Sequence, residues 1–253
     1  MLEEGAVEVQ IADGVAEVSF FHPKKNSLPG DLLRRLAAEI DRLGRNDEAR
    51  VVALRSLGDG PFCAGASFDE MLAAQDFEHA RTFFMGFAQV ILAMKKCPRF
   101  VVARVQGKAV GGGVGLIAAS DYVLASQRAS IKLAEFALGF GPFVIGPAVA
   151  RKTGQAAFAA ASIDTEWRDA NWCKANGLYT EIYESSEELD GAFGSLTSRL
   201  AKTSPEAVAE LKRIFWEGTD GWETLLPSRA EISARLILSD FTRNAISAFR
   251  DKR

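Results

Sequence analysis

Short apolar runs rich in β-branched residues alternate with stretches of helical periodicity over the first two thirds of the chain. Five of these runs predict strands: Val7–Ile11, Val15–Phe20, Val51–Arg55, Phe100–Val105 and Tyr122–Ala125. Asp13-Gly14 predicts a tight turn between the first two runs. Between Asp31 and Leu43 the apolar residues recur at helical spacing, which predicts a helix. Strands that alternate with helices indicate an α/β protein with a largely parallel sheet.

From Glu184 onward the pattern is purely helical. The apolar residues between Leu189 and Leu200 fall on one helix face, and Ser204-Pro205 predicts the N-cap and first position of the next helix. Ser228–Phe249 predicts a third, long helix. We therefore expect residues 1–184 to form a core, and residues 185–253 to form a helical region that caps this core or makes a subunit interface.

The charged residues nearly balance, since 30 Lys+Arg against 33 Asp+Glu give a formal charge of −3. This balance argues against nucleic acid or an anionic membrane as a partner. The longest uncharged run, Phe136–Ala150, is shorter than the roughly 20 residues that span a bilayer, and the acidic start does not resemble a secretory signal. The three cysteines are far apart and only two histidines exist, so we expect no disulfide, no metal site and a reducing cytoplasm.

Two loops of small residues are candidates for binding a negatively charged atom. Gly111–Gly115 lies between a predicted strand and an apolar run. Glycine allows close approach of another group, and N–H groups at a helix start attract an anion or a polarised carbonyl oxygen. Tight packing of helix on strand explains the same glycines equally well. The second loop, Phe62–Ser67, precedes a helix for which Ser67 and Glu70 predict a capping box.

Glu135 is flanked by apolar residues on both sides. A carboxylate that loses hydration has a raised pKa and becomes a usable general acid or base near neutral pH. The alternative is a solvent-facing glutamate on a buried segment. Gly113–Ala118 also matches the dinucleotide-binding pattern, with Glu135 as the acidic residue further on. The span Leu116–Ser120 is too short for the usual crossover helix, however, which argues against an NAD(P) site.

Several of these stretches, in order and spacing, resemble motifs of the crotonase superfamily, the enoyl-CoA hydratase/isomerase family. The matching stretches are Asn26–Leu28, Phe62–Phe68, Gln106–Gly113 with Ala119–Asp121, Ala134-Glu135 with Leu138-Gly139, Asn176–Leu178 and Phe249–Arg253. The resemblance covers nearly the whole chain. It implies an α/β fold, a crotonase-like spiral of ββα repeats with a C-terminal helical trimerisation region, assembled as a homotrimer or a dimer of trimers.

The resemblance also implies an acyl-CoA thioester substrate and gives roles to individual residues. The backbone N–H groups of Ala66 and Gly112 would form an oxyanion hole for the thioester oxygen, and Glu135 would be the catalytic base. No cofactor is implied beyond the coenzyme A of the substrate. Candidates for contacts with CoA or substrate are Lys24, Lys25, Ala64, Ser67, Phe68 and Lys252. Solvated surface positions are the alternative for the lysines.

The acyl group of such a substrate needs an apolar tunnel. A helix predicted over Leu72–Phe87 carries four phenylalanines that would line this tunnel or belong to the core. They are Phe77, Phe83, Phe84 and Phe87.

The chain departs from the family's hydratases at one position. Hydratases carry a second glutamate where Gly115 stands here. The family's isomerases resemble this chain, with a non-acidic residue there and a Pro-aromatic pair such as Pro142-Phe143. We therefore expect a double-bond isomerase with a single glutamate base. The alternatives are a hydratase in which Asp69 or Glu70 replaces the missing acid, and a non-catalytic acyl-CoA-binding subunit.

Overall fold

The computed structural model describes residues 5–250, with side chains through residue 248. The elements along the chain are β1 (Ala6–Ala12), β2 (Val15–Phe21), α1 (Gly30–Gly44), β3 (Val51–Ser56), α2 (Phe68–Ala73), α3 (Phe77–Lys96), β4 (Val101–Val105), β5 (Ala109–Val110), α4 (Gly112–Ala119), β6 (Tyr122–Ser126), β7 (Ser130–Lys132), the 3₁₀ helix η1 (Phe136–Leu138), α5 (Gly146–Thr153), α6 (Gln155–Ile163), β8 (Arg168–Asp169), α7 (Ala170–Ala175), β9 (Glu181–Tyr183), α8 (Ser186–Leu200), α9 (Pro205–Phe215), α10 (Trp222–Ile237) and α11 (Asp240–Arg250).

Two sheets organise the chain. The larger has six strands in the order β1-β2-β3-β4-β6-β9, and the smaller has the order β5-β7-β8. β1 and β2 form an antiparallel hairpin, whereas β2, β3, β4, β6 and β9 run parallel. The expected α/β class with a largely parallel sheet is confirmed, and so are the first turn and helix. Asp13 and Gly14 have φ of +50° and +82°, as a tight hairpin turn requires.

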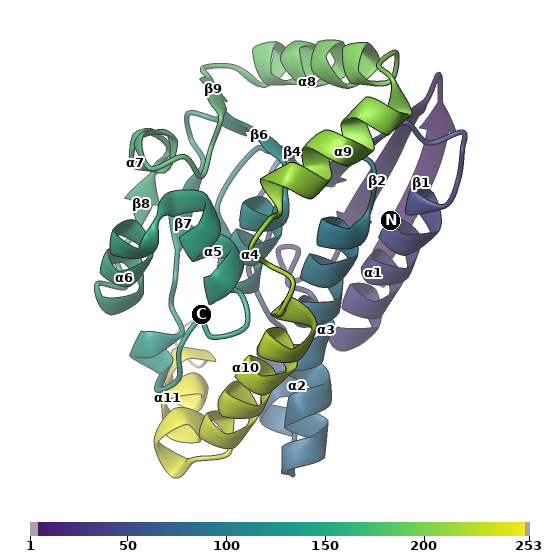
Figure 1. Ribbon diagram of the computed structural model, residues 1–253. Helices are drawn as coiled ribbons and strands as arrows, with labels where there is room; N and C mark the ends of the chain where they lie inside the picture. The colour runs from purple at the N-terminus through teal and green to yellow at the C-terminus, as the bar shows by residue number, and fades with distance from the viewer. Residues whose placement is uncertain (1–4, 251–253) are drawn as a thin grey trace.

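Helices cover both faces of the larger sheet at its centre, where the strands β3, β4 and β6 are almost entirely buried. Val51 and Ala53 of β3 belong to a small cluster with Leu189 and Phe193 of α8. Val52 and Leu54, which point the opposite way, belong to the main core. Figure 1 shows α8 running along one edge of the molecule and α1 and α3 packed side by side on the other side of the sheet.

Two of the predicted helices are each broken in the structure. The expected helix over Ser228–Phe249 begins earlier, at Trp222, and is divided into α10 and α11. The hydroxyl of Ser239 accepts a hydrogen bond from Thr242 N at 3.3 Å, so that a new helix begins there. The stretch over Leu72–Phe87 is likewise divided into α2 and α3, because the Asp76 carboxylate accepts from His79 N at 2.9 Å and caps α3. An apolar repeat runs through both breaks without marking them.

The helices after Glu184 pack closely on the preceding part of the chain. α10 lies along α3, and α11 contacts α2 and η1. In α11 the Thr242 hydroxyl donates to Gly139 O at 3.1 Å, and the Arg243 guanidinium donates to Ala74 O. The described part of residues 185–253 therefore contributes to the same core as residues 5–184.

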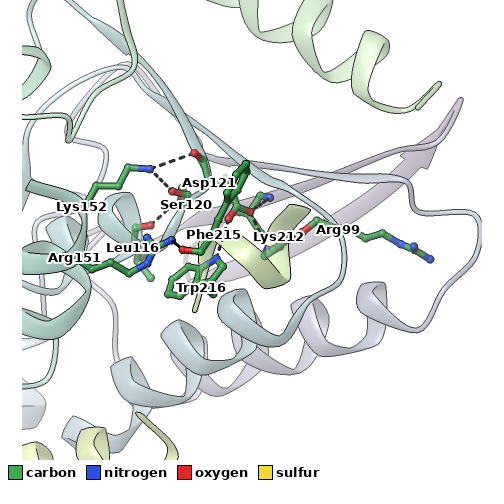
Figure 2. A network of polar contacts seen from close by, with 10 residues as sticks. Arg99, Leu116, Ser120, Asp121, Arg151, Lys152, Lys212, Phe215 and Trp216 are labelled. Carbon is green, nitrogen blue, oxygen red and sulfur yellow. Dashed lines mark hydrogen bonds and ion pairs between the residues drawn. The ribbon is translucent and has the colours of Figure 1, made fainter. Parts of the chain in front are cut away.

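A buried polar network joins α9 to the sheet (Figure 2). Lys212 Nζ lies 2.8 Å from Asp121 Oδ2, and the two side chains are only 3% and 6% exposed. The same Nζ donates to Arg99 O at 2.7 Å, and Trp216 Nε1 donates to Asp121 Oδ1 at 3.1 Å. Asp121 also accepts from Val101 N at 2.7 Å, so both of its oxygens are engaged. The network fixes α9 at the start of β4 and β6.

Candidate active site

The two loops of small residues identified in the sequence lie side by side. Val110 N donates to Cys63 O at 2.9 Å, and Cys63 N donates to Lys108 O at 3.2 Å. The first loop is held on its other side by Leu28 N, which donates to Gly65 O at 2.8 Å. These backbone bonds bring Ala66 and the start of α4 to one pocket, although they are far apart in sequence.

The N–H groups of Ala66 and Gly112 are available as donors at this pocket. Gly111 precedes α4 with φ +51°, and Gly112 is the first residue of the helix, where no intrahelical acceptor exists. In residues 5–250 neither N–H donates to another backbone group. An added Cβ on Gly112 would lie 2.1 Å from the Phe87 ring, and one on Gly113 would lie 2.7 Å from Cys63 Cβ. The glycine run thus serves both tight packing and exposure of N–H groups, the two readings that the sequence left open.

Glu135 faces the same pocket from the segment after β7. Gly111 N donates to Lys132 O at 2.9 Å, which ties this segment to the glycine loop. An added Cβ on Gly111 would lie 2.9 Å from Glu135 Oε1, so the carboxylate lies against the loop. The residue is 9% exposed, and its Oε2 has no hydrogen-bond partner within the described chain. Burial raises the pKa of Glu135 to about 7, although nearby backbone N–H groups lower it in part.

The pocket is small and almost entirely apolar. Its cavity volume is about 60 Å³, and Glu135 and Ser233 are the only polar side chains among the described residues that line it. Phe84 and Phe87 line it as the sequence suggested for the acyl tunnel, whereas Phe77 and Phe83 do not. Ser233 comes from α10, and no sequence signal marked it. A carboxylate in such surroundings is a base that can be either protonated or ionised near neutral pH.

At Gly115, where family hydratases carry a second glutamate, the space for a side chain is already occupied. An added Cβ on Gly115 would lie 2.5 Å from Cγ2 of Ile145, which is itself a lining residue of the pocket. Asp69 and Glu70, the two residues that the sequence offered as replacements for this acid, do not line the pocket. Asp69 pairs with Lys24 Nζ, and Glu70 Oε2 accepts from Gly30 N at 2.7 Å and caps α1.

Some of the residues expected to contact CoA line the pocket, and others do not. Ala64 and Phe68 line the pocket, and the Ala64 N–H donates to Lys25 O at 3.2 Å. The side chains of Lys24 and Lys25 do not line it; Lys24 is exposed beside Asp69. Lys252 lies outside the described residues, as does the end of the Phe249–Arg253 motif.

Ser67 does not line the pocket and acts as the N-cap of α2. Its hydroxyl accepts from Glu70 N at 3.4 Å. The predicted capping box is half wrong, because the Glu70 side chain binds Gly30 N of another helix instead of returning to Ser67 N.

The glycine run and Glu135 are not arranged as in a dinucleotide-binding site. Glu135 follows β7 of the smaller sheet, whereas the strand after α4 is β6 of the larger one. In a dinucleotide-binding unit the acidic residue belongs with the strand that follows the helix. The match to that pattern is therefore coincidental.

Comparison with known proteins identifies the family. The sequence profile described as enoyl-CoA hydratase/isomerase matches residues 10–253. The chain is 27% identical over 234 residues to a mitochondrial methylglutaconyl-CoA hydratase of Rattus norvegicus, covering 90% of this chain and 74% of that one. It is 27% identical over 256 residues to a probable enoyl-CoA hydratase of Rhodobacter capsulatus, covering 98% and 95%.

Solved structures agree in fold. The crystal structure of an enoyl-CoA hydratase from Bacillus halodurans matches with a TM-score of 0.88 at 20% identity, covering 96% of this chain and 99% of that one. The chain belongs to the enoyl-CoA hydratase/isomerase family and has its crotonase-type fold, as the motifs indicated.

Sites of two other kinds are absent from the described part of the chain. Between residues 5 and 250 no three His, Cys, Asp or Glu side chains are grouped so that they could hold a metal ion. In the same part of the chain no helix has the length and apolar character needed to cross a bilayer.

Proposed function

We propose that this enzyme moves a double bond within an enoyl-CoA, with Glu135 as its only acid–base group. The observation that carries the proposal is the composition of the pocket. Glu135 is the single acid among the described lining residues, and Ile145 occupies the space that a side chain at position 115 would need. Adding water across a double bond requires a group that holds the water as well as one that moves the proton, whereas a double-bond shift requires one base.

The reaction needs no other reagent. With a 3-enoyl-CoA, the Glu135 carboxylate takes a proton from C2, and the electron pair of that C–H bond delocalises onto the thioester oxygen and the C3–C4 double bond. The N–H groups of Ala66 and Gly112 stabilise the resulting dienolate oxygen. Glu135 then returns the proton to C4, and the double bond lies between C2 and C3. A pKa of about 7 suits a group that must both accept and release the proton.

No cofactor takes part in this mechanism apart from the coenzyme A carried by the substrate. Ala64 and Phe68, which line the pocket, would contact the pantetheine and acyl parts. Lys24, Lys25 and Lys252 would attract the phosphates, and Ser67 would act indirectly by capping α2. The cytoplasmic location expected from the sequence stays a prediction.

Hydration of a 2-enoyl-CoA is the second candidate, because the curated relatives carry hydratase names. A non-catalytic acyl-CoA binder is the third. A single experiment separates the three: 3-enoyl-CoA and 2-enoyl-CoA esters are incubated with the enzyme in heavy water, and products are analysed for deuterium at C2 and C4 and for a 3-hydroxyl group. We expect conversion between the two enoyl esters with exchange at both carbons and no 3-hydroxyacyl product. Dominant hydration, or binding without turnover, would refute the isomerase.

The role of Glu135 has its own test. Glu135→Gln should lower kcat by about 10²–10⁴-fold, while the Kd of a saturated acyl-CoA stays nearly unchanged, because glutamine keeps the size of the side chain. Wild-type turnover in this variant would remove Glu135 from the mechanism.

The region 185–253 is proposed to assemble the protein into a homotrimer or a dimer of trimers. Large apolar side chains are exposed on its helices, including Leu211 and Phe215 of α9 and Phe241 of α11, which are 46%, 52% and 71% exposed. Exposed apolar side chains grouped on a helix are typical of interfaces. The molar mass in solution, measured by light scattering, tests this directly, and a monomeric mass would contradict it.

A further inference from the structure

The pocket beside Glu135 holds only a small volume. The cavity volume is about 60 Å³. One water-sized group needs about 10–15 Å³, so the cavity has room for about four to six such groups. A methylene group is of similar size. Part of this space must hold the thioester carbon and the reacting carbons, because they have to lie between Glu135 and the two N–H groups.

A much larger apolar groove lies on the other side of one wall of this pocket. The groove has a volume of about 930 Å³. Among the described residues it shares with the pocket only Phe140, Gly141, Pro142 and Phe143. The wall is thus one short segment of chain, with reacting groups on one side and a space for a long apolar chain on the other.

Phe143 belongs to this shared segment and packs against it. Its N–H donates to Gly141 O at 2.7 Å, and its ring lies so close to Gly141 that an added Cβ there would be 2.7 Å from Cζ. Phe140 is fixed from the pocket side, where its ring meets that of Phe84 edge-on with the centroids 5.9 Å apart. Phe143 is only partly buried, so it is the member of the wall whose side chain can be removed with the least damage to the core.

We infer that Phe143 sets the upper limit of acyl-chain length, and that the enzyme takes short acyl groups of about four to six carbons. This inference rests on the proposed function, because it assumes that the acyl group enters the pocket beside Glu135. It adds the class of substrate and the residue that selects it.

Binding of saturated acyl-CoA esters tests the limit without any catalytic step. Kd is measured by calorimetry for the series from acetyl-CoA to decanoyl-CoA. Each methylene that enters an apolar pocket should tighten binding about fourfold, so Kd should fall steeply up to four to six carbons and then level off or rise. In Phe143→Ala the pocket joins the groove, and the fall in Kd should continue to eight or ten carbons, with little change for acetyl-CoA.

Phe158→Ala is the matched control, because Phe158 lines the groove and not the pocket. It should leave the limit unchanged. Phe143→Leu, a milder change, should shift the limit by fewer carbons and covers the case in which the alanine variant does not fold. If wild-type Kd falls steadily to ten carbons, or if Phe143→Ala and Phe143→Leu fold but keep the wild-type limit, the inference is wrong. If no acyl-CoA binds at all, the proposed function itself fails.

Discussion

The side chain of Ile145 fills the space next to the Cα of Gly115, at the position where family hydratases carry their second acid. A Cβ on residue 115 would be 2.5 Å from Ile145 Cγ2 and 2.8 Å from its Cβ. The absence of the second acid is therefore matched by the packing around it. A single substitution cannot restore a carboxylate here without a collision inside a buried helix.

Gly115→Glu should consequently destabilise the protein and give no hydratase. Overpacking alone costs about 1–3 kcal/mol, and the buried carboxylate adds to this. Urea unfolding measures the loss, and the hydration of a short 2-enoyl-CoA measures the activity.

The control is the double variant Gly115→Glu with Ile145→Ala. It should recover part of the lost stability and, unlike the single variant, should hydrate a short 2-enoyl-CoA. Wild-type stability in the single variant would show that the packing at Ile145 is looser than described.

Activity should depend on pH through Glu135. Because burial raises its pKa to about 7, the carboxyl group is protonated below this pH and cannot accept the C2 proton. We expect kcat/KM to fall about tenfold per pH unit below 7 and to reach a plateau above it. An ordinary exposed glutamate, with a pKa of about 4.3, would give a flat profile from pH 5.5 to 8.5, and a flat profile would contradict the assignment. Thermal unfolding over the same range controls for loss of structure.

A methyl group on Gly112 should be enough to disturb the oxyanion hole. The donor is a backbone group, but the Phe87 ring would lie 2.1 Å from the added Cβ, so even a methyl group displaces its surroundings. Gly112→Ala should shift the first turn of α4 and lower kcat by about 10²–10³-fold, the usual effect of losing one such donor.

Gly191→Ala is the control for Gly112→Ala, because nothing lies within 4 Å of the added Cβ in α8. This variant should keep full activity and gain about 0.5–1 kcal/mol of stability. Equal activity in the two variants would remove Gly112 from the oxyanion hole.

The ion pair between Lys212 and Asp121 should matter greatly for stability. Lys212→Met leaves the buried Asp121 carboxylate without its charged partner, which typically costs 3–5 kcal/mol. Arg213, the next residue of α9, is 63% exposed and pairs only at the surface. Arg213→Met should change the free energy of unfolding by less than about 0.5 kcal/mol. Similar losses in the two variants, measured by urea unfolding, would contradict the role of the buried pair.

Local patterns in the sequence predicted several of the elements and singled out the carboxylate that the structure places in the pocket. The hairpin at Asp13-Gly14, the helix start at Ser204-Pro205 and the glycine run at the start of α4 each depend on residues close together in the chain, and the structure has all three. Glu135 was singled out in the same way, because its apolar neighbours Ala134 and Leu138 line the pocket with it.

Contacts between residues far apart in the chain could not be predicted from the sequence. Glu70 caps α1 rather than its own helix, because Gly30 N lies within reach only after folding. Ser233 and Ile145 reach the pocket from α10 and from the loop before α5, and neither carries a local signal. The breaks at Asp76 and Ser239 were missed because the apolar repeat continues across them while the caps act on single N–H groups.

The two hydrogen bonds that hold α11 have a consequence for the dynamics of the enzyme. Thr242 and Arg243 bind carbonyl groups of Gly139 and Ala74, which lie at the ends of two segments bordering the pocket. Detachment of α11 and opening of the pocket wall should therefore be one event, and amide hydrogens of this helix should exchange more slowly once an acyl-CoA is bound. Exchange in α11 would then indicate whether the pocket beside Glu135 is occupied, although none of the described side chains of α11 lines that pocket.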